Sequence, residues 1–147
     1  MSHPTTGSAG TARTTDRAPY QYLALTIGVV YLLVGLAGFL VTGFDGFAQH
    51  DDSKSLLGFH VNPLHNIVHL IIGAAGVALW RTRSGARTYG WLLAVGYGAT
   101  FLYGLLAVNN PDINFLNING ADNVLHLVSA LAGLVIALWP DRHRDRV

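Results

Sequence analysis

The chain has 147 residues, of which 51% are hydrophobic and only 12% are Lys, Arg, Asp or Glu. This is about half the charged share of an ordinary soluble domain, so a water-soluble fold would have too little polar surface to cover its core. The sequence has no cysteine, which excludes disulfides, thiolate metal ligands and a thiol nucleophile. It also lacks a phosphate loop, a dinucleotide fingerprint and the basic–aromatic pattern of nucleic-acid binders. We therefore predict an all-α, polytopic membrane protein whose surroundings are the lipid bilayer.

Four long apolar runs alternate with short polar segments and predict four transmembrane helices. The expected membrane domain covers residues 20–140, with helices at 21–42, 63–80, 88–108 and 120–139. Residues 1–19 are rich in Ser, Thr, Gly and Ala, and we expect a disordered cytoplasmic tail there. Residues 141–147 form a basic cytoplasmic tail. The first apolar run is longer than an ordinary signal-peptide core, so we expect it to remain as a helix rather than be cleaved.

The arginines give the expected orientation. All eight lie in the two tails or in the connection between the second and third helices, whereas Lys54 is the only Lys or Arg of the other two loops. Because cytoplasmic segments carry the excess of positive charge, we expect a multi-pass protein of the plasma membrane with both termini in the cytoplasm. Interfacial belts are rich in Tyr and Trp, and the cytoplasmic helix ends carry Tyr20, Tyr22, Trp80, Tyr89, Trp91 and Trp139.

An internal repeat organises the chain, since residues 62–80 align without gaps on residues 119–137. The polar matches are Asn62 with Asn119, His65 with Asp122, Asn66 with Asn123, and His69 with His126. We therefore interpret the chain as two repeated helical hairpins related by an axis along the membrane normal. The same helix faces carry small residues deeper in, at Gly73, Gly76, Ala130 and Gly133. We expect these faces of the second and fourth helices to pack together, and a stripe in the third helix to pack closely at Gly96, Thr100 and Gly104.

If the repeated faces meet, four side chains converge at the outer end of the bundle, namely His65, His69, Asp122 and His126. Three imidazoles and a carboxylate form a suitable ligand set for a divalent transition metal. The two histidines of the second helix are one turn apart, a spacing at which one helix can offer two ligands. His50 and His60 in the preceding loop could add a further ligand. We expect helix caps or second-layer contacts from Asn62, Asn66, Asn119 and Asn123.

Three alternatives stay open. The polar residues could form only a hydrogen-bonded network that locks helix packing in a structural or interaction protein, as a homo-oligomer or in a larger membrane complex. A b-type haem would need two facing axial imidazoles, most simply His69 and His126. Hydrolysis would use Asp122 with a histidine, or Ser129 one turn below His126. A serine in a transmembrane helix is usually a packing residue, so we assign no catalytic residue and favour a non-enzymatic role.

The segment from Phe59 to His69, together with Asn119 to His126, resembles a family of small, mainly actinobacterial membrane proteins. That family has four predicted helices and is known only as a domain of unknown function. The resemblance covers about Tyr22 to Trp139, and its most specific part is the pattern Asn-Pro-x-His-Asn-x-x-His. It implies an integral membrane location and brings no activity, ligand or partner.

Overall fold

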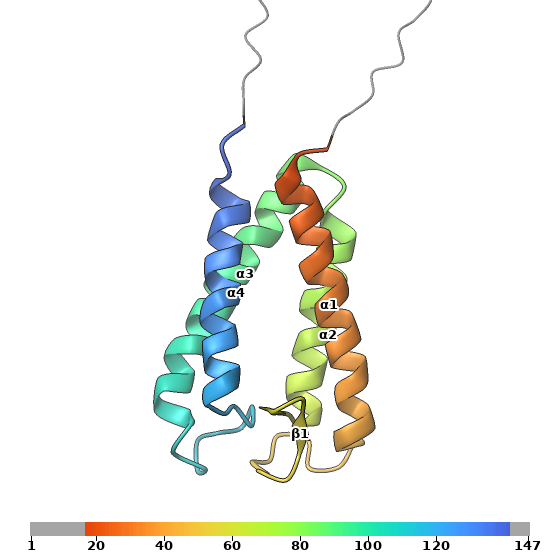
Figure 1. Ribbon diagram of the computed structural model, residues 1–147. Coiled ribbons are helices and arrows are strands. Elements are labelled where there is room, and N and C mark those ends of the chain that lie inside the picture. Colours follow the sequence, from red (N-terminus) through yellow and green to blue (C-terminus); the bar gives the residue numbers. More distant parts are fainter. Residues whose placement is uncertain (1–16, 142–147) are drawn as a thin grey trace, which may run out of the picture.

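The computed structural model describes residues 17–141; the predicted tails at 1–19 and 141–147 lie outside the described residues except for residues 17–19 and 141. The helices are α1 (Pro19–Thr42), α2 (Pro63–Leu79), α3 (Arg83–Ala107) and α4 (Gly120–Leu138). Two short strands, β1 (Ser55–Leu56) and β2 (Phe59–His60), pair antiparallel in the connection between α1 and α2. The helices run side by side, with both ends of the described chain at one end of the bundle and the two longer connections at the other (Figure 1). We call the latter the loop end.

Side-chain caps fix where three of the helices begin. The Asn62 side chain accepts a hydrogen bond from the backbone of His65, and Pro63 occupies the first helical position, where its missing N–H is not needed. Asn119 caps α4 in the same way. Thr82 accepts from the Gly85 amide at 3.0 Å, so α3 begins at Arg83 rather than at residue 88. The basic connection is correspondingly short.

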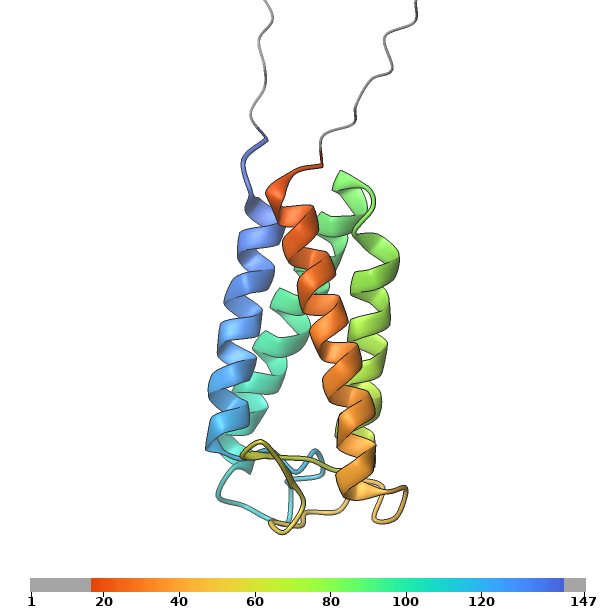
Figure 2. The same cartoon turned by 45° about the vertical axis from the view of Figure 1, so that its right-hand side comes forward.

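The helices pack as two pairs, α1 with α2 and α3 with α4, which stand beside each other in Figure 2. Glycines allow the close approach: a Cβ at Gly76 would lie 2.7 Å from the Cα of Gly28. In the other pair, a Cβ at Gly133 would lie 2.6 Å from the backbone nitrogen of Ala94. The prediction that the second and fourth helices pack face to face was wrong, because these glycines face α1 and α3. Both helices are described in full, and no Cα atoms of α2 and α4 lie within 8 Å of each other.

The prediction that Gly96, Thr100 and Gly104 of α3 form a close-packing stripe was also wrong for two of the three residues. A Cβ at Gly96 would meet nothing within 4 Å, and the Thr100 hydroxyl bonds to the Gly96 carbonyl of its own helix. The close contact with α4 is made by Gly90 instead, where a Cβ would lie 2.7 Å from the backbone nitrogen of Ala137. Gly104 does lie at the interface, directly against the Asn123 side chain. Small residues therefore mark packing here only where they face the partner helix.

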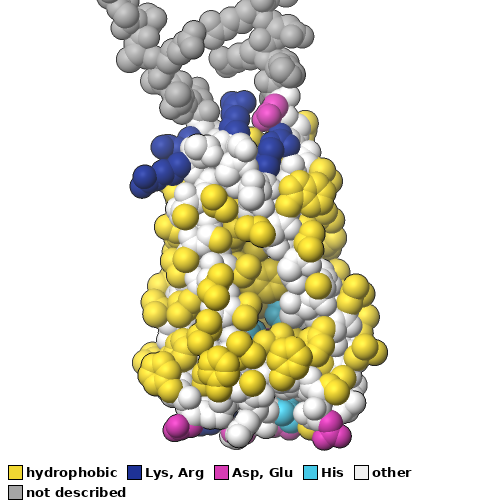
Figure 3. Space-filling model, turned by 180° about the vertical axis from the view of Figure 1, so that it is seen from behind, with side chains coloured by type: hydrophobic (Ala, Val, Ile, Leu, Met, Phe, Trp, Pro, Cys, Tyr) yellow, Lys and Arg dark blue, Asp and Glu magenta, His cyan; other side chains and the backbone are white. Residues whose placement is uncertain are grey.

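The exposed and buried side chains show the pattern of a membrane protein. Aliphatic residues such as Leu33, Leu40 and Leu106 are more than half exposed, whereas the buried set is rich in Tyr, His and Asn. In Figure 3 apolar side chains cover the sides of the bundle, the blue side chains at the terminal end are arginines, and Asp and His appear at the loop end. Three helices, α1, α3 and α4, are long and apolar enough to cross a membrane, while α2 has 17 residues. These features fit a lipid bilayer.

Two members of the predicted aromatic belt are core residues instead, because Tyr20 and Tyr89 are fully buried. The Arg87 guanidinium lies over the Tyr20 ring, 5.2 Å from its centroid. It also donates to the carbonyls of Ala137 and Trp139 at 2.8 and 2.6 Å, and pairs with Asp141 at 3.2 Å. Arg87 thus satisfies the free carbonyls at the end of α4, and it is more than a marker of membrane orientation.

Candidate metal centre

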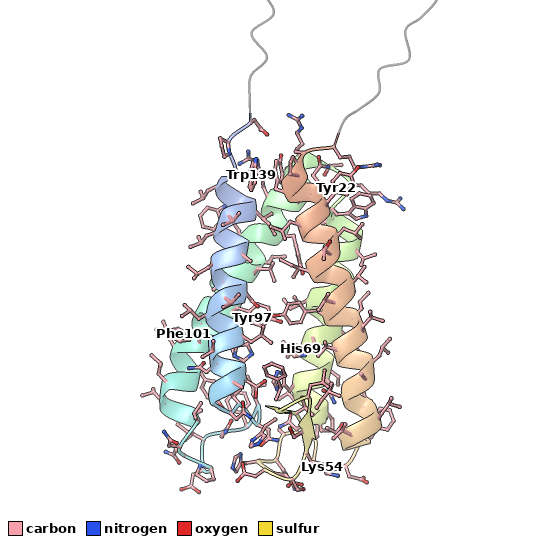
Figure 4. All side chains as sticks on the ribbon, in the orientation of Figure 1. Tyr22, Lys54, His69, Tyr97, Phe101 and Trp139 are labelled. Carbon is pink, nitrogen blue, oxygen red and sulfur yellow. The ribbon has the colours of Figure 1, made fainter. Side chains whose placement is uncertain are left out.

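Three histidines meet between the two helix pairs. His65, His69 and His126 are all buried, and one ring nitrogen from each lies within 4.8 Å of the others. The Nε2 atoms of His65 and His69 are 3.1 Å apart, and the ring centroids of His65 and His126 are 5.9 Å apart. Figure 4 shows His69 and Tyr97 pointing into the space between the pairs. The side chains bridge a gap that the backbones of α2 and α4 do not close.

Two tyrosines line the cluster. The Tyr31 ring packs on His69 with centroids 5.0 Å apart, and the Tyr97 ring packs on His126 at 5.3 Å. The tyrosines stack on each other at 5.1 Å, and the Tyr31 hydroxyl hydrogen-bonds the Ser129 hydroxyl at 2.5 Å. The sequence analysis missed both residues. Their equivalent placement in α1 and α3, 66 positions apart, is the signal that could have identified them.

Each of the three imidazole rings has a ring nitrogen that makes no hydrogen bond. The Nδ1 atoms of His65, His69 and His126 are buried and have no hydrogen-bond partner among the described residues. Buried polar atoms are nearly always paired, and leaving one unpaired costs about 1–3 kcal/mol. The amide oxygens of Asn66 and Asn123 are unpaired in the same way, although these residues fill helix interfaces. The three imidazoles therefore have nitrogen atoms that are not engaged by other side chains.

Asp122, the fourth predicted ligand, occupies a different position. Its Oδ2 accepts from the backbone amides of Asn119 and His60, each at 3.0 Å. The carboxylate thus joins the first turn of α4 to strand β2. It lies one turn before His126 on the same helix, but it is not part of the three-histidine group. The structure therefore brings together three of the four predicted ligands and places the fourth beside them.

Asn66 and Asn123 were expected to contact the histidines, but each lies in the interface within its own helix pair. The Asn66 amide donates to the Thr42 hydroxyl at 3.0 Å and lies directly against Gly38. Asn123 lies in the same way against Gly104. Neither has a hydrogen bond to a histidine of the cluster. They fill the interface within each pair, whereas Asn62 and Asn119 cap the helices.

Buried amides join the two connections over the loop end. Asn117 accepts from the Asp51 amide at 3.0 Å and donates to the carbonyls of Asp51 and Val61 at 2.9 and 3.0 Å. The Asn62 amide donates to the carbonyls of Gln49 and Phe115 at 3.1 and 2.8 Å. The sequence analysis assigned no role to Asn117 and expected Asn62 to act only as a cap or in contacts around the histidines. They hold the connections together at the end of the bundle that carries the histidine cluster.

A family model described as a domain of unknown function (DUF4383) matches residues 21–139. The chain belongs to this family. Neither the curated proteins nor the solved structures contain a significant match. The DUF4383 match extends over all four helices and both loop-end connections, so the histidine cluster lies within the family domain.

Proposed function

We propose that this DUF4383 protein is a four-span protein of the plasma membrane with both termini in the cytoplasm. Arginines lie at the terminal end of the bundle (Figure 3) and Lys54 lies at the loop end (Figure 4), which fits the excess of positive charge expected on the cytoplasmic side. Helix α2 is the shortest span, and Arg81 directly after it can extend to the interface. The loop end then faces outward, and the histidine cluster lies towards the outer side.

The two helix pairs are repeats of one hairpin, and three sets of contacts support this. Gln21 donates to the Trp80 carbonyl at the end of α2, as Arg87 does to the end of α4. The tyrosine–histidine contacts recur in both pairs, as do the glycine–asparagine contacts. In α1 and α3 the matched residues stand 66 positions apart, at Gln21 and Arg87, Tyr31 and Tyr97, and Gly38 and Gly104.

The function that the geometry supports best is binding of a divalent transition metal by His65, His69 and His126. Ligands about 2.0–2.1 Å from a tetrahedral ion lie about 3.3 Å from one another, close to the 3.1 Å between the first two rings. The rings are fixed by helices and by stacked tyrosines, which hold the donors in place before an ion binds. Asp122 is the only carboxylate of α4 and lies one turn before His126. The single observation that carries the proposal is the convergence of three buried imidazole nitrogens from two helix pairs.

The geometry favours a small ion over the haem alternative. Axial ligation by His69 and His126 would need a porphyrin-wide gap between the two rings. His65 lies beside both of them, with centroids 4.4 and 5.9 Å away. Tyr31 and Tyr97 close the remaining side. A metal ion needs no such gap.

Elemental analysis of detergent-purified protein after loading with Zn²⁺, Co²⁺, Ni²⁺ or Cu²⁺ tests the proposal. We expect one equivalent of metal that the double variant His69→Gln, His126→Gln loses. Tyr97→Phe is the matched control, because Tyr97 packs on the His126 ring without offering it a ligand atom. If the double variant retains all the metal of the wild type, the cluster is a packing network in a structural or interaction protein.

A further inference from the structure

The β1–β2 hairpin, residues 55–60, reaches from one helix pair to the other. Strand β1 lies against α1, and strand β2 lies against the start of α4. The Asn119 amide donates to the Gly58 carbonyl at the tip of the hairpin at 2.8 Å, and the His60 amide donates to the Asp122 carboxylate at 3.0 Å. The hairpin thus connects the two helix pairs at the loop end (Figure 1).

The hairpin also lies next to the buried histidine cluster. The backbones of His60 in β2 and of Leu116 in the other connection lie beside the His65 ring. Asp122, to which the His60 amide is bonded, lies one turn before His126 on α4. All three histidines of the cluster are at most 3% exposed. An ion from the outer side therefore reaches them only when part of this cover moves.

The sides of the bundle do not admit a hydrated ion to the cluster. Histidine side chains are visible between the helix pairs from behind, at a level where apolar side chains surround them (Figure 3). In the proposed membrane, lipid tails cover this face, and the transfer of a charged ion into hydrocarbon is strongly unfavourable. Entry from the outer water therefore passes the connections at the loop end.

We propose that the β1–β2 hairpin is the gate of the metal site. Its tip detaches from α4, and a divalent transition metal ion from the outer side then reaches His65, His69 and His126. This inference rests on the metal binding proposed above and adds the path of entry. When the bonds to Asn119 and Asp122 form again, the ion is enclosed.

The tip is held only weakly. A two-stranded hairpin is marginally stable by itself, and each strand here has two residues. At the tip, Leu57 is 88% exposed and has a φ of 55°, a left-handed conformation that is unfavourable for leucine. The bond from Asn119 to Gly58 is exposed, so water can replace it. Segments of this kind open locally without unfolding of the rest of the protein.

The base of the hairpin is held more firmly and can serve as a hinge. The Val61 amide donates to the Lys54 carbonyl at 3.0 Å, and the Val61 carbonyl accepts from the Asn117 amide at 3.0 Å. Val61 and Asn117 are both buried, which shields these bonds from water. The hairpin is therefore expected to move about its base.

Two further histidines strengthen the connection rather than the cluster. His50 and His60 were expected to be able to add a ligand, but they are not part of the three-histidine group. The Oδ1 atom of Asp52 lies 3.3 Å from the Nε2 atom of His50 and 3.3 Å from the Nδ1 atom of His60. This His50–Asp52–His60 group joins the start of the connection to strand β2.

The test compares a locked and a free hairpin in full-length protein reconstituted in lipid nanodiscs. The chain has no cysteine, so Leu57→Cys with Gly120→Cys introduces the only two thiols. Both positions are exposed, and Gly120 follows Asn119, so a short bis-maleimide can join the hairpin to α4. The control is the same variant with each thiol capped separately. We expect the cross-link to slow Co²⁺ uptake at least tenfold without changing the amount bound after long incubation.

A second measurement needs no metal. Diethyl pyrocarbonate modifies unprotonated imidazoles, and mass spectrometry of peptides follows each histidine separately. We expect the cross-link to slow the modification of His65 at least fivefold. His50 lies outside the cluster with 20% of its side chain exposed, and it should react equally in both samples. Gel filtration and circular dichroism check that both samples are folded.

Asn119→Ser tests the gate in the opposite direction. Serine still caps α4, but it has no amide to donate to the Gly58 carbonyl. We expect Co²⁺ uptake and His65 modification to become about fivefold faster, the change that one hydrogen bond makes. The matched control is Asn110→Ser, because Asn110 is an exposed asparagine of the same connection that bonds to the nearby Asp112 amide. It should keep the wild-type rates.

The outcomes separate the gate from the metal site. If the cross-link changes neither rate, or if Asn119→Ser is no faster than the wild type, the gate is overturned, and the amount of Co²⁺ bound still decides the metal proposal. If no sample binds Co²⁺ but the cross-link protects His65, the hairpin controls access to the cluster and only the metal proposal fails.

Discussion

The two helix pairs make the same kinds of contact, in part through the same residue types. In each pair the first helix donates to the carbonyls at the end of the second, through Gln21 in one case and Arg87 in the other. In each pair a tyrosine packs on a histidine and a glycine admits an asparagine. The proposed repeat therefore extends to α1 and α3, whose sequences show little likeness. What is repeated is the set of packing contacts, more than the residues that make them.

The pairs differ in their connections and at the cluster. The connection from α1 to α2 contains the β1–β2 hairpin and the His50–Asp52–His60 group, while the connection from α3 to α4 is shorter and rich in asparagine. At the helix entrances His65 in α2 corresponds to Asp122 in α4. The candidate chemistry thus lies where the two helix pairs differ, while the contacts that they share hold the helices in place.

The largest expected effect comes from filling the glycine contacts that the pairs share. Gly76→Leu and Gly133→Leu each place a side chain where even a Cβ would overlap backbone atoms of the neighbouring helix. Inserting methylenes into a packed core costs about 1–3 kcal/mol, and a displaced backbone costs more. We expect each variant to lose most of the folded protein in thermal unfolding followed by gel filtration.

Gly96→Leu is the matched control, since a Cβ there meets nothing within 4 Å. It should stay within about 0.5 kcal/mol of the wild type, or be slightly more stable, because glycine is a poor helix former. If Gly133→Leu were tolerated and Gly76→Leu were not, the two pairs would not be equivalent in packing.

A smaller loss is expected from cutting the bonds between the two connections. Asn117→Ala removes three hydrogen bonds and places alanine at a φ of 53°, in the left-handed region. At about 0.5–1.5 kcal/mol for each bond, plus the conformational cost, we expect a loss of about 2–4 kcal/mol in denaturant unfolding. Asn117→Gly should recover about 1 kcal/mol of this, because glycine adopts the left-handed conformation freely. If glycine and alanine were equally destabilising, the backbone conformation would contribute nothing.

The next effect tests a difference between the pairs. The Tyr31 hydroxyl bonds to Ser129, whereas the Tyr97 hydroxyl has no hydrogen-bond partner among residues 17–141, and the position of α2 that aligns with Ser129 is Ile72. Tyr31→Phe should therefore cost about 0.6 kcal/mol, a typical value for side-chain bonds between transmembrane helices. Tyr97→Phe should be neutral or stabilising, since it removes a buried unpaired hydroxyl. Equal losses in thermal unfolding would contradict the asymmetry.

The sequence predicted the helices well because their signals are local. Apolar runs, the caps at Asn62 and Asn119, and the arginine clusters all act within a few residues. The partner of each helix face could not be predicted in this way, because a small residue permits close packing but does not determine which helix packs against it. Gly73 and Gly76 were therefore assigned to α4, although they face α1.

The same limit applies to the candidate site. The histidines were found by their spacing and by the repeat, and three of them do meet. Asp122 was grouped with them because it aligns with His65, but an aspartate at the third position of a helix also completes a capping box, and its carboxylate bonds to backbone amides. Tyr31 and Tyr97 lie in long apolar helices, where nothing local distinguishes them from membrane-facing residues.

The smallest expected effect lies in the connection between α1 and α2, the longer of the two connections. Hydrogen bonds from the Ser53 hydroxyl and amide lower the pKa of the Asp51 carboxyl below its ordinary value. A lowered pKa in the folded state means that this turn is stabilised when Asp51 is ionised. The stabilisation is complete above the unfolded pKa of about 3.9 and is lost as the pH falls through the lower, folded value. Because the Asp51 side chain is only partly buried, the change in stability should be slight. An NMR titration of the Asp51 carboxyl carbon should therefore show a midpoint below that of an unfolded peptide.

Ser53→Ala should raise this midpoint only part of the way to the peptide value, because the amide of residue 53 still donates to the Asp51 carboxylate. An unchanged midpoint would show that the Ser53 hydroxyl does not stabilise this turn.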